Sequence, residues 1–216
     1  MKATYDYRTE TEKLSDQIRE AIISGEFPMG TRLPQRFLAE RFNTTTTVVR
    51  ESLRSLESEG LIHIIPRFGA VVDQITHDNL LGRYLVREAL EGMAARVAND
   101  KITPEAKDKL IELATECDDK LPCDGISAVE KSQIHLNLHN YIAELTEIPE
   151  LINPLRNIYL SAMIKANAHA VNWKEEFPNW HRQLVDAIIE GSPDEAEAMM
   201  RKHVRRGYEM EKSKLK

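Results

Sequence analysis

The order of short segments between residues 30 and 69 constrains the fold of this chain more than any other feature. Two short amphipathic helices are predicted there, and a polar turn rich in threonine joins them. A β-ribbon of residues 61–65 and 70–72 with a basic tip follows. A winged helix needs this order to place one helix in the major groove of DNA and a loop beside it. Double-stranded DNA is therefore the first partner to consider.

Local signals set the bounds of the helices in this half. Thr9 and Glu12 have the spacing of a capping box at the start of a first helix. The second helix is expected to begin near Pro34, since proline suits a first turn, and one of the threonines at 44–46 is expected to cap the third. The buried face of the second helix is predicted from its apolar residues, Phe37, Leu38 and Phe42.

Everything after Asp73 is predicted to be helix. The change from mixed α/β to all-α predicts two domains, a winged-helix DNA-binding domain of residues 1–74 and an all-helical domain of residues 75–216. The fold class is therefore mainly α, with an N-terminal winged helix-turn-helix and a C-terminal helical bundle. Helices are expected at about residues 77–99, 104–120, 127–145, 149–171, 178–190 and 193–212.

Composition narrows the class of protein. A chain of 216 residues with 42% hydrophobic and 30% charged residues is typical of a soluble globular protein, and no apolar run spans a bilayer. The N-terminus lacks the apolar core of a signal peptide, and Cys117 and Cys123 form no disulfide framework, so the cytoplasm is the expected compartment. The net charge of −6 argues against general nucleic-acid coating, so individual arginines must carry DNA binding.

The first turn of the third helix is the predicted reading element, because a recognition helix points its N-terminal end into the groove. Thr45, Thr46 and Thr47 lie there, and threonine can contact bases or phosphates through its hydroxyl and methyl groups. The alternative is that these threonines only cap the helix and that the exposed arginines form a solvated face. Three arginines could reach one duplex from three elements: Arg32, Arg50 and Arg67.

Four short motifs stand out in this half: GTRLP at 30–34, LAE at 38–40, VRESL at 49–53 and EGLI at 59–62. Together they resemble the winged-helix signature of the GntR superfamily of bacterial transcription regulators. The resemblance covers nearly all of residues 10–73. It implies that DNA is contacted by Arg32, Thr45, Thr47, Arg50, Arg67 and Gly69.

The chain departs from that signature at two positions. Thr46 stands where the family usually has arginine, and Val48 where it often has proline. Losing the arginine removes a bidentate contact to guanine, worth about 1–3 kcal/mol of discrimination between bases. The operator sequence is therefore expected to differ from those of related proteins.

Four histidines of the helical half have spacings that predict convergence. His135 and His139 are four residues apart on one helix, so their side chains share a face. His181 and His203 each lie eleven residues from Ser192, so a hairpin folded there brings them level. Imidazoles at this spacing suit zinc, nickel or another borderline divalent cation. The alternative is that these histidines are surface residues or satisfied core residues.

Residues 84–91 (YLVREALE) and the segment from His181 to His203 resemble the FCD-type ligand-binding domain of the FadR subfamily. In its metal-binding members the ligands are one aspartate and three histidines. His139, His181 and His203 fall on the histidine positions, and His135 falls on the aspartate position. A set of four histidines adds no negative charge, which should favour softer metals over Mg²⁺ or Mn²⁺ and make binding more sensitive to acid. Alternatively, His135 no longer binds the metal.

The FCD resemblance also implies a ligand for the metal. The metal would receive the carboxylate of a small organic acid, and Arg87 would be a second anchor for that effector. An ion pair of Arg87 with Glu88 or Glu91 is the alternative for this residue. The metal could also be purely structural, or could itself be the signal.

Three functions fit these features. The leading hypothesis is a homodimeric transcription regulator, in which each winged helix reads half of a roughly palindromic operator and an effector changes their relative placement. A metal-dependent enzyme is the rival. Against an enzyme, the sequence offers no well-placed general base, because the nearby candidates Asp186 and Glu190 lie on ordinary helical faces. Four protein ligands would also leave little room on the metal for a reactive water. A sensor of the metal alone predicts that chelation changes operator affinity.

Overall fold

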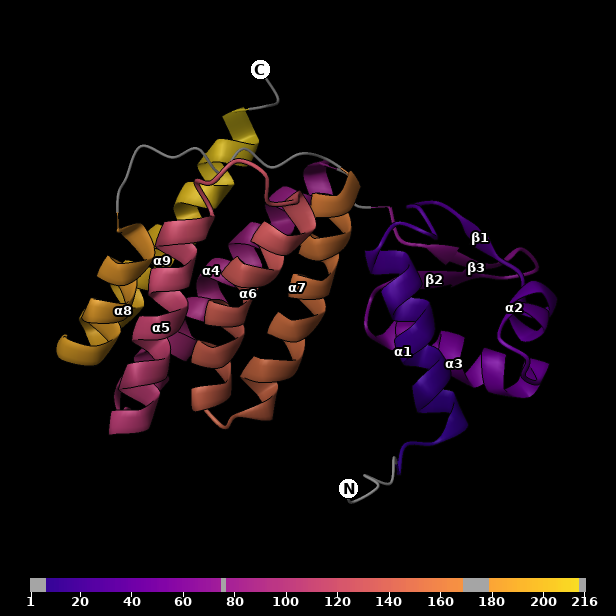
Figure 1. The fold of residues 1–216 in the computed structure, drawn as a ribbon, viewed down its shortest axis with the longest axis horizontal. Helices are drawn as coiled ribbons and strands as arrows, with labels where there is room; N and C mark the ends of the chain where they lie inside the picture. Colours follow the sequence, from indigo (N-terminus) through magenta and orange to yellow (C-terminus); the bar gives the residue numbers. More distant parts are fainter. Residues whose placement is uncertain (1–6, 75–76, 169–178, 214–216) are drawn as a thin grey trace. The chain divides into compact units, whose positions relative to one another are not determined.

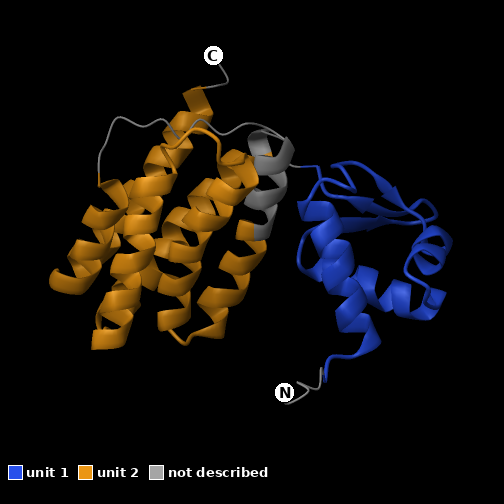
Figure 2. Ribbon diagram, in the orientation of Figure 1, with its two compact units in different colours: residues 1–74 blue, residues 75–216 orange. Residues whose placement is uncertain are grey.

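The computed structural model describes residues 7–74, 77–168 and 179–213, and the chain divides into two compact units between residues 74 and 75 (Figure 2). The described part of the first unit contains three helices and a small antiparallel sheet, and the described part of the second contains six helices (Figure 1). The elements are α1 Glu10–Ile23, β1 Arg32–Leu33, α2 Gln35–Arg41, α3 Thr46–Ser58, β2 Ile62–Ile65, β3 Gly69–Val72, α4 His77–Asn99, α5 Pro104–Lys120, α6 Ala128–Leu145, α7 Pro149–Ala168, α8 Trp180–Glu190 and α9 Pro193–Ser213.

The first helix starts at the capping box that its sequence predicts. The backbone N–H of Glu12 donates to Oγ1 of Thr9 at 3.2 Å, and the backbone N–H of Thr9 donates to Oε2 of Glu12 at 2.7 Å. These reciprocal bonds satisfy N–H groups that the first turn leaves without intrahelical partners. The helix then buries one face, through Leu14, Ile18 and Ile22.

The next two helices form the helix-turn-helix. Thr45 is the N-cap of α3, where its Oγ1 accepts a hydrogen bond from the backbone N–H of Val48 at 3.3 Å. Leu38 is fully buried and Phe42 is partly buried, as predicted. The prediction for Phe37 is wrong, because 46% of this residue is exposed and its ring meets Phe27 edge to face at 6.4 Å. A helix of two turns has room for only a narrow buried stripe, and Phe37 lies beside that stripe.

Three strands, rather than the two predicted, make the wing sheet. Their order is β1-β3-β2, and both pairings are antiparallel. The extra strand, β1, has only two residues, and its Arg32 is paired with Val71 of β3. This pairing fixes Arg32 at the edge of the wing, next to the tip where β2 turns into β3.

A shared core and two polar contacts join α1 to α3. Ser52 Oγ donates to the backbone oxygen of Thr11 at 3.0 Å, and Arg19 binds both carboxylate oxygens of Glu59 at 2.8 Å. The exposed side of α3 is therefore set by tertiary contacts on its opposite face. The core of the unit includes Leu33, Leu53, Leu56, Leu61 and Val72.

The helices of the second unit fall close to their predicted bounds, and α4 matches its predicted range at both ends. α4 packs against α6, α7, α8 and α9, so it is the central helix of the bundle (Figure 1). Two predicted bounds lie outside the described residues: the end at residue 171 of the helix predicted for 149–171, and the start at residue 178 of the helix predicted for 178–190. The largest core cluster joins α4, α5, α6, α8 and α9, and its fully buried members include Leu110, Leu138, Leu184 and Ile188.

The turn between α8 and α9 carries its own capping box. The N–H of Ser192 donates to Oε2 of Glu195 at 2.7 Å, and the N–H of Glu195 donates back to Oγ of Ser192 at 3.3 Å. Asn99 of α4 donates from Nδ2 to the backbone oxygens of Ile188 and Gly191, at 2.8 and 2.9 Å. These bonds hold the α8–α9 hairpin against α4. The hairpin places His181 of α8 and His203 of α9 at the same height along the two helices.

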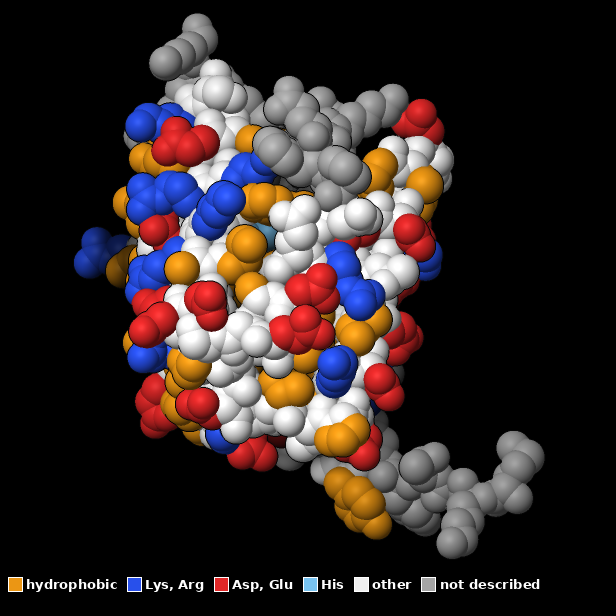
Figure 3. Space-filling view, turned by 90° about the vertical axis from the view of Figure 1, so that its left-hand side faces the viewer, with side chains coloured by type: hydrophobic (Ala, Val, Ile, Leu, Met, Phe, Trp, Pro, Cys, Tyr) orange, Lys and Arg blue, Asp and Glu red, His pale blue; other side chains and the backbone are white. Residues whose placement is uncertain are grey.

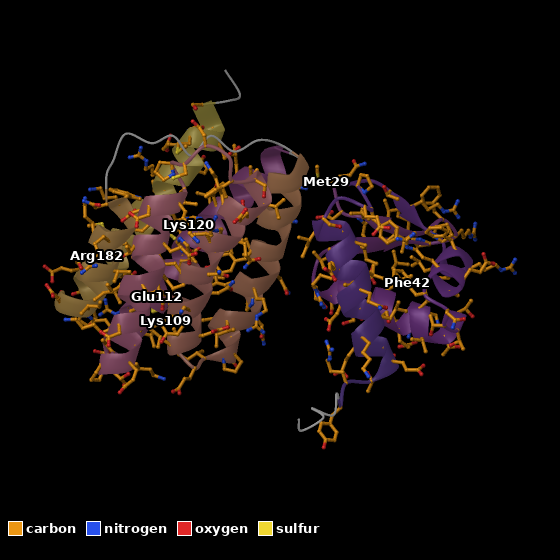
Figure 4. The ribbon with its side chains drawn as sticks, in the orientation of Figure 1. Met29, Phe42, Lys109, Glu112, Lys120 and Arg182 are labelled. Atoms are coloured by element: carbon orange, nitrogen blue, oxygen red, sulfur yellow. The ribbon has the colours of Figure 1, made fainter. Side chains whose placement is uncertain are left out.

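The outer face of α5 is polar. Along α5, Lys109 pairs with Glu112 and Lys120 pairs with Glu116, each at 2.8 Å. Figure 4 marks Lys109, Glu112 and Lys120 along this helix. Within the described residues, no helix combines the length and apolar character needed to cross a bilayer.

Candidate functional site

Four imidazoles from three helices gather in the core of the second unit. His135 and His139 come from α6, His181 from α8 and His203 from α9. Nε2 of His135 lies 3.0 Å from Nε2 of His139 and 3.3 Å from Nε2 of His203. One nitrogen from each of these three rings lies within 4.8 Å of the others, a spacing that could hold a metal ion.

His181 lies beside this group of three. Its ring centroid is 5.1 Å from those of His135 and His203. Its Nδ1 lies 2.7 Å from Oδ1 of Asp118 on α5. With Nδ1–H donated to that carboxylate, the lone pair of His181 is on Nε2, the tautomer in which a metal-binding histidine is usually held. The structure therefore places all four predicted histidines together, although only His135, His139 and His203 have ring nitrogens within 4.8 Å of one another.

Burial keeps three of these imidazoles neutral, those of His135, His139 and His203. Loss of solvent and the neighbouring histidines lower the pKa of His135 and His203 well below the usual value. Burial also lowers the pKa of His139, against the opposing effect of Glu91. Neutral imidazoles offer lone pairs rather than positive charge, which is what a cation requires of them.

A buried ion pair lies behind His139. Oε2 of Glu91 is 2.6 Å from Nδ1 of His139, at hydrogen-bond distance but without in-line geometry. Oε1 of the same carboxylate accepts from Nε of Arg87 at 2.5 Å. Burial by itself would raise the pKa of Glu91, but Arg87 and His139 outweigh it and hold this pKa at about 2. Glu91 is therefore an anion that contacts both a predicted metal ligand and the predicted effector anchor.

The predicted anchor, Arg87, is in the ion pair that the sequence left as its alternative, with Glu91 rather than Glu88. Burial disfavours its charge, yet Glu91 raises its pKa, so the guanidinium stays charged. Its Cζ lies 5.2 Å from the ring of Tyr84 and 5.5 Å from that of Tyr159. Glu91 accepts from the Nε–H of Arg87, and Tyr84 is also within hydrogen-bonding reach of this guanidinium.

The donor set fits a borderline divalent cation. Nε2 of His135 lies within 3.0 to 3.3 Å of Nε2 of two other rings. A neutral ring nitrogen carries either one proton or one lone pair, so a single N–H···N hydrogen bond can satisfy only one of these contacts, whereas a cation can bind all three lone pairs. Carboxylates lie behind His139 and His181, where they favour the tautomers that present Nε2. Nitrogen ligands of this kind suit zinc or nickel better than magnesium.

Sequence reasoning missed two neighbours of this cluster. Asp118 has no local relation to His181, because the two residues are 63 positions apart. Trp180 stacks on His203, with ring centroids 5.9 Å apart and planes 21° apart, and it lies next to His181 in the sequence. Only a prediction of how α5, α8 and α9 pack could have found these contacts.

The predicted DNA-contacting residues lie on the surface of the first unit. Thr45, Thr46, Thr47 and Arg50 are all exposed at the start of α3, so the turn predicted to read bases is accessible. The presence of threonine at position 45 is already explained by its role as the N-cap of α3, without a contact to DNA. Thr46 and Thr47 have no such local role in capping.

The wing brings the remaining predicted contacts together. Arg67 is exposed at the tip, with φ of 65°, and Gly69 follows with φ of 103°. The guanidinium of Arg32 lies 4.6 Å from the ring centroid of Phe68, itself 46% exposed. Residues 32, 67 and 69 therefore lie on one surface of the wing. Arg32 comes from β1, Arg67 from the β2–β3 turn and Gly69 from the start of β3.

Two families match this chain. Residues 10–72 match the bacterial regulatory proteins of the gntR family, and residues 83–206 match the FCD domain. The two matches correspond to the two compact units of the structure. Both families, and the relatives below, are transcriptional regulators rather than enzymes.

Curated relatives match over most of their length. The "Probable D-xylose utilization operon transcriptional repressor" of Paenarthrobacter nicotinovorans is 26% identical over 209 residues, which cover 94% of this chain and 91% of the relative. The "Exu regulon transcriptional regulator" of Escherichia coli (strain K12) is 25% identical over 219 residues, covering 89% and 81%.

Solved structures share the fold. A GntR transcriptional regulator from Rhodococcus sp. RHA1 superposes with a TM-score of 0.74 at 17% identity, over 95% of this chain and 99% of the other. E. coli McbR/YncC gives a TM-score of 0.73 at 18% identity, over 97% and 100%. At these identities the likeness concerns the fold alone.

Proposed function

The chain belongs to the GntR family of bacterial transcription regulators and carries an FCD domain, and from this we propose that a small organic acid controls its DNA binding. In this proposal the acid binds beside a divalent metal in the helical unit. The observation that carries it is the close group of buried imidazoles with Arg87 connected to it through Glu91. A metal and a guanidinium at one site suit a carboxylate.

DNA binding is assigned to the exposed start of α3 and to the wing. The N-terminal turn of α3 presents threonine hydroxyls, and Arg50 extends one turn further along the helix. Helix N-termini favour phosphates, and a helix entering the major groove contacts bases first through this end. The residues assigned to DNA contact are Arg32, Thr45, Thr46, Thr47, Arg50, Arg67 and Gly69.

The metal is assigned to the histidine cluster. His135, His139 and His203 would hold it, with His181 as the fourth ligand, and zinc or nickel is the cation that the donor set favours. When bound, the cation supplies a positive centre for the carboxylate of the effector. The protein supplies the rest: Asp118 orients His181, and Glu91 orients both His139 and Arg87.

A homodimer is part of the proposal, because one short helix reads too few base pairs for useful specificity. An apolar stripe on α4 supports it, since Leu85 and Val86 are each 48% exposed and Met93 is 40% exposed. Ala89 lies between them and is also exposed. Apolar residues at this helical spacing, turned away from the unit's own core, suit contact with a second copy. A cytoplasmic location follows from an operator as the partner.

The test begins with DNA selected from a random-sequence pool by the metal-loaded protein. Fluorescence anisotropy then measures affinity for the selected duplex with and without small carboxylates, and after chelation. The proposal expects at least one carboxylate to change operator affinity only when the metal is present. A change on chelation with no response to any acid would favour the metal itself as the signal. Failure to enrich any sequence would contradict specific DNA binding.

A further inference from the structure

A lysine next to the histidine cluster is buried without a charge partner. Lys131 of α6 is only 9% exposed, and across the described part of the chain its ammonium group makes no ion pair or hydrogen bond. Its Nζ is not among the unpartnered polar atoms that are fully enclosed, so this atom keeps some contact with solvent. Lysine is rarely buried unless it is paired, because leaving water costs an ammonium group free energy. A ligand that supplies an anion would remove that cost.

Lys131 faces the same way as the histidines on its helix. It precedes His135 by four residues, which places the two side chains on one face and about 6 Å apart along the helix axis. His135 is the member of the close group of three that is partly exposed. A ligand that reaches the cluster from the start of α6 would therefore pass Lys131.

Two further cations lie near His203, each against the ring of Trp180. The ring of Trp180 stacks on His203, and both Lys202 and Arg206 lie over that ring, with Nζ at 5.6 Å and Cζ at 5.5 Å from its centroid. Arg206 follows His203 by three residues, so it lies about one turn beyond it on α9.

These elements share one end of the bundle. The start of α6, the start of α8 and the end of α9 all lie toward that end (Figure 1). On the side of α8 and α9, a histidine shows at the surface among hydrophobic side chains, with Lys and Arg side chains gathered beside it (Figure 3). The nearby carboxylate of Asp118 is already occupied by three hydrogen bonds from His181 and Arg182.

We infer that this end is a second anionic subsite, formed by Lys131 and Arg206 beside Trp180, and that the effector is an acid with two anionic groups. The inference rests on the proposed function and narrows its ligand class. One carboxylate would bind at the metal and Arg87. The other would pair with the Lys131 ammonium and the Arg206 guanidinium, while Trp180 would cover the carbon chain between them.

The experiment compares acids of equal length that differ by one carboxylate, butyrate with succinate and valerate with glutarate. Isothermal titration calorimetry on the full-length zinc-loaded protein, at fixed ionic strength, gives each affinity. In at least one pair the diacid should bind about tenfold more tightly or better, the scale of one charge-assisted hydrogen bond. Lys131→Met keeps the aliphatic stem and removes the charge, so it should abolish this preference while leaving the monoacid affinity unchanged.

Lys212→Met is the matched control, because Lys212 is exposed further along α9 and lies over Tyr208 instead. It should retain the preference for the diacid. Arg206→Met is the second variant, should Lys131→Met unfold, and zinc content is measured for every variant. Equal affinities within both pairs, or an unchanged preference in the Lys131 and Arg206 variants, would overturn the subsite and leave the proposed function standing. Absence of binding by all four acids would overturn the subsite and count against the acid effector itself.

Discussion

The Asp118 carboxylate binds His181 twice, accepting from Nδ1 at 2.7 Å and from the backbone N–H at 3.1 Å. Its other oxygen accepts from the backbone N–H of Arg182 at 2.9 Å. One side chain of α5 therefore satisfies the first turn of α8 and sets the ring of a proposed metal ligand. These bonds also lower the pKa of Asp118, against the opposing effect of its burial.

Asp118→Asn should weaken metal binding. An amide can present NH₂ to Nδ1 instead of an acceptor, which favours the wrong tautomer of His181 and removes a negative charge near the cation. Changes of this kind typically cost about 10–100-fold in metal affinity. Competition with a chromophoric chelator measures the loss. Asp186→Asn, which removes an exposed carboxylate paired with Arg182 on the same helix, is the control and should bind zinc as the unmodified protein does.

Glu91→Gln should destabilise the helical unit strongly. The change leaves the buried Arg87 without its anion, and removing one partner of a buried ion pair typically costs about 3–5 kcal/mol. Urea unfolding followed by circular dichroism gives the free energy of unfolding. Glu112→Gln removes the exposed partner of Lys109 and should cost at most about 1 kcal/mol. Equal losses in the two variants would show that the Arg87–Glu91 pair contributes no more than a surface pair.

The convergence of the histidines could be predicted because each step is local. Helical periodicity puts His135 and His139 on one face, and the capped turn at Ser192 makes His181 and His203 level. The contact of Glu91 with His139 could not be predicted in this way. It depends on how α4 packs against α6, which no spacing within either helix records.

The wing shows the same division between local and long-range information. The two strands on either side of Arg67 follow from their apolar runs and from the turn between them. β1 was missed because two residues are too few to show any periodicity, and only its pairing with β3 makes it a strand. That pairing places Arg32 against Phe68, the neighbour of Arg67, so DNA contacts that were predicted separately for Arg32 and Arg67 lie on one surface.

Charged substitutions on α4 test the proposed dimer. Val86→Glu combined with Met93→Glu would place two carboxylates in the apolar stripe, where a second copy would have to bury them. We expect the protein to become monomeric in analytical ultracentrifugation and to lose affinity for a palindromic operator. Thr115→Glu on the exposed face of α5 is the control and should stay dimeric. A doubly substituted protein that remains dimeric would place the interface elsewhere.

Thr46→Arg should change which operators the protein prefers. Thr46 is exposed in the first turn of α3, so an arginine there can extend into the groove without displacing any core residue. A new bidentate contact to guanine would favour guanine-containing sites by about 1–3 kcal/mol over the same sites without it. Selection from a random pool, repeated with both proteins, reads this out as a gained guanine at one position in each half-site. Arg54→Ala, two turns further along α3 and paired with Glu51, is the control and should select the same sites as the unmodified protein. If Thr46→Arg also selects unchanged sites, the start of α3 does not face base edges.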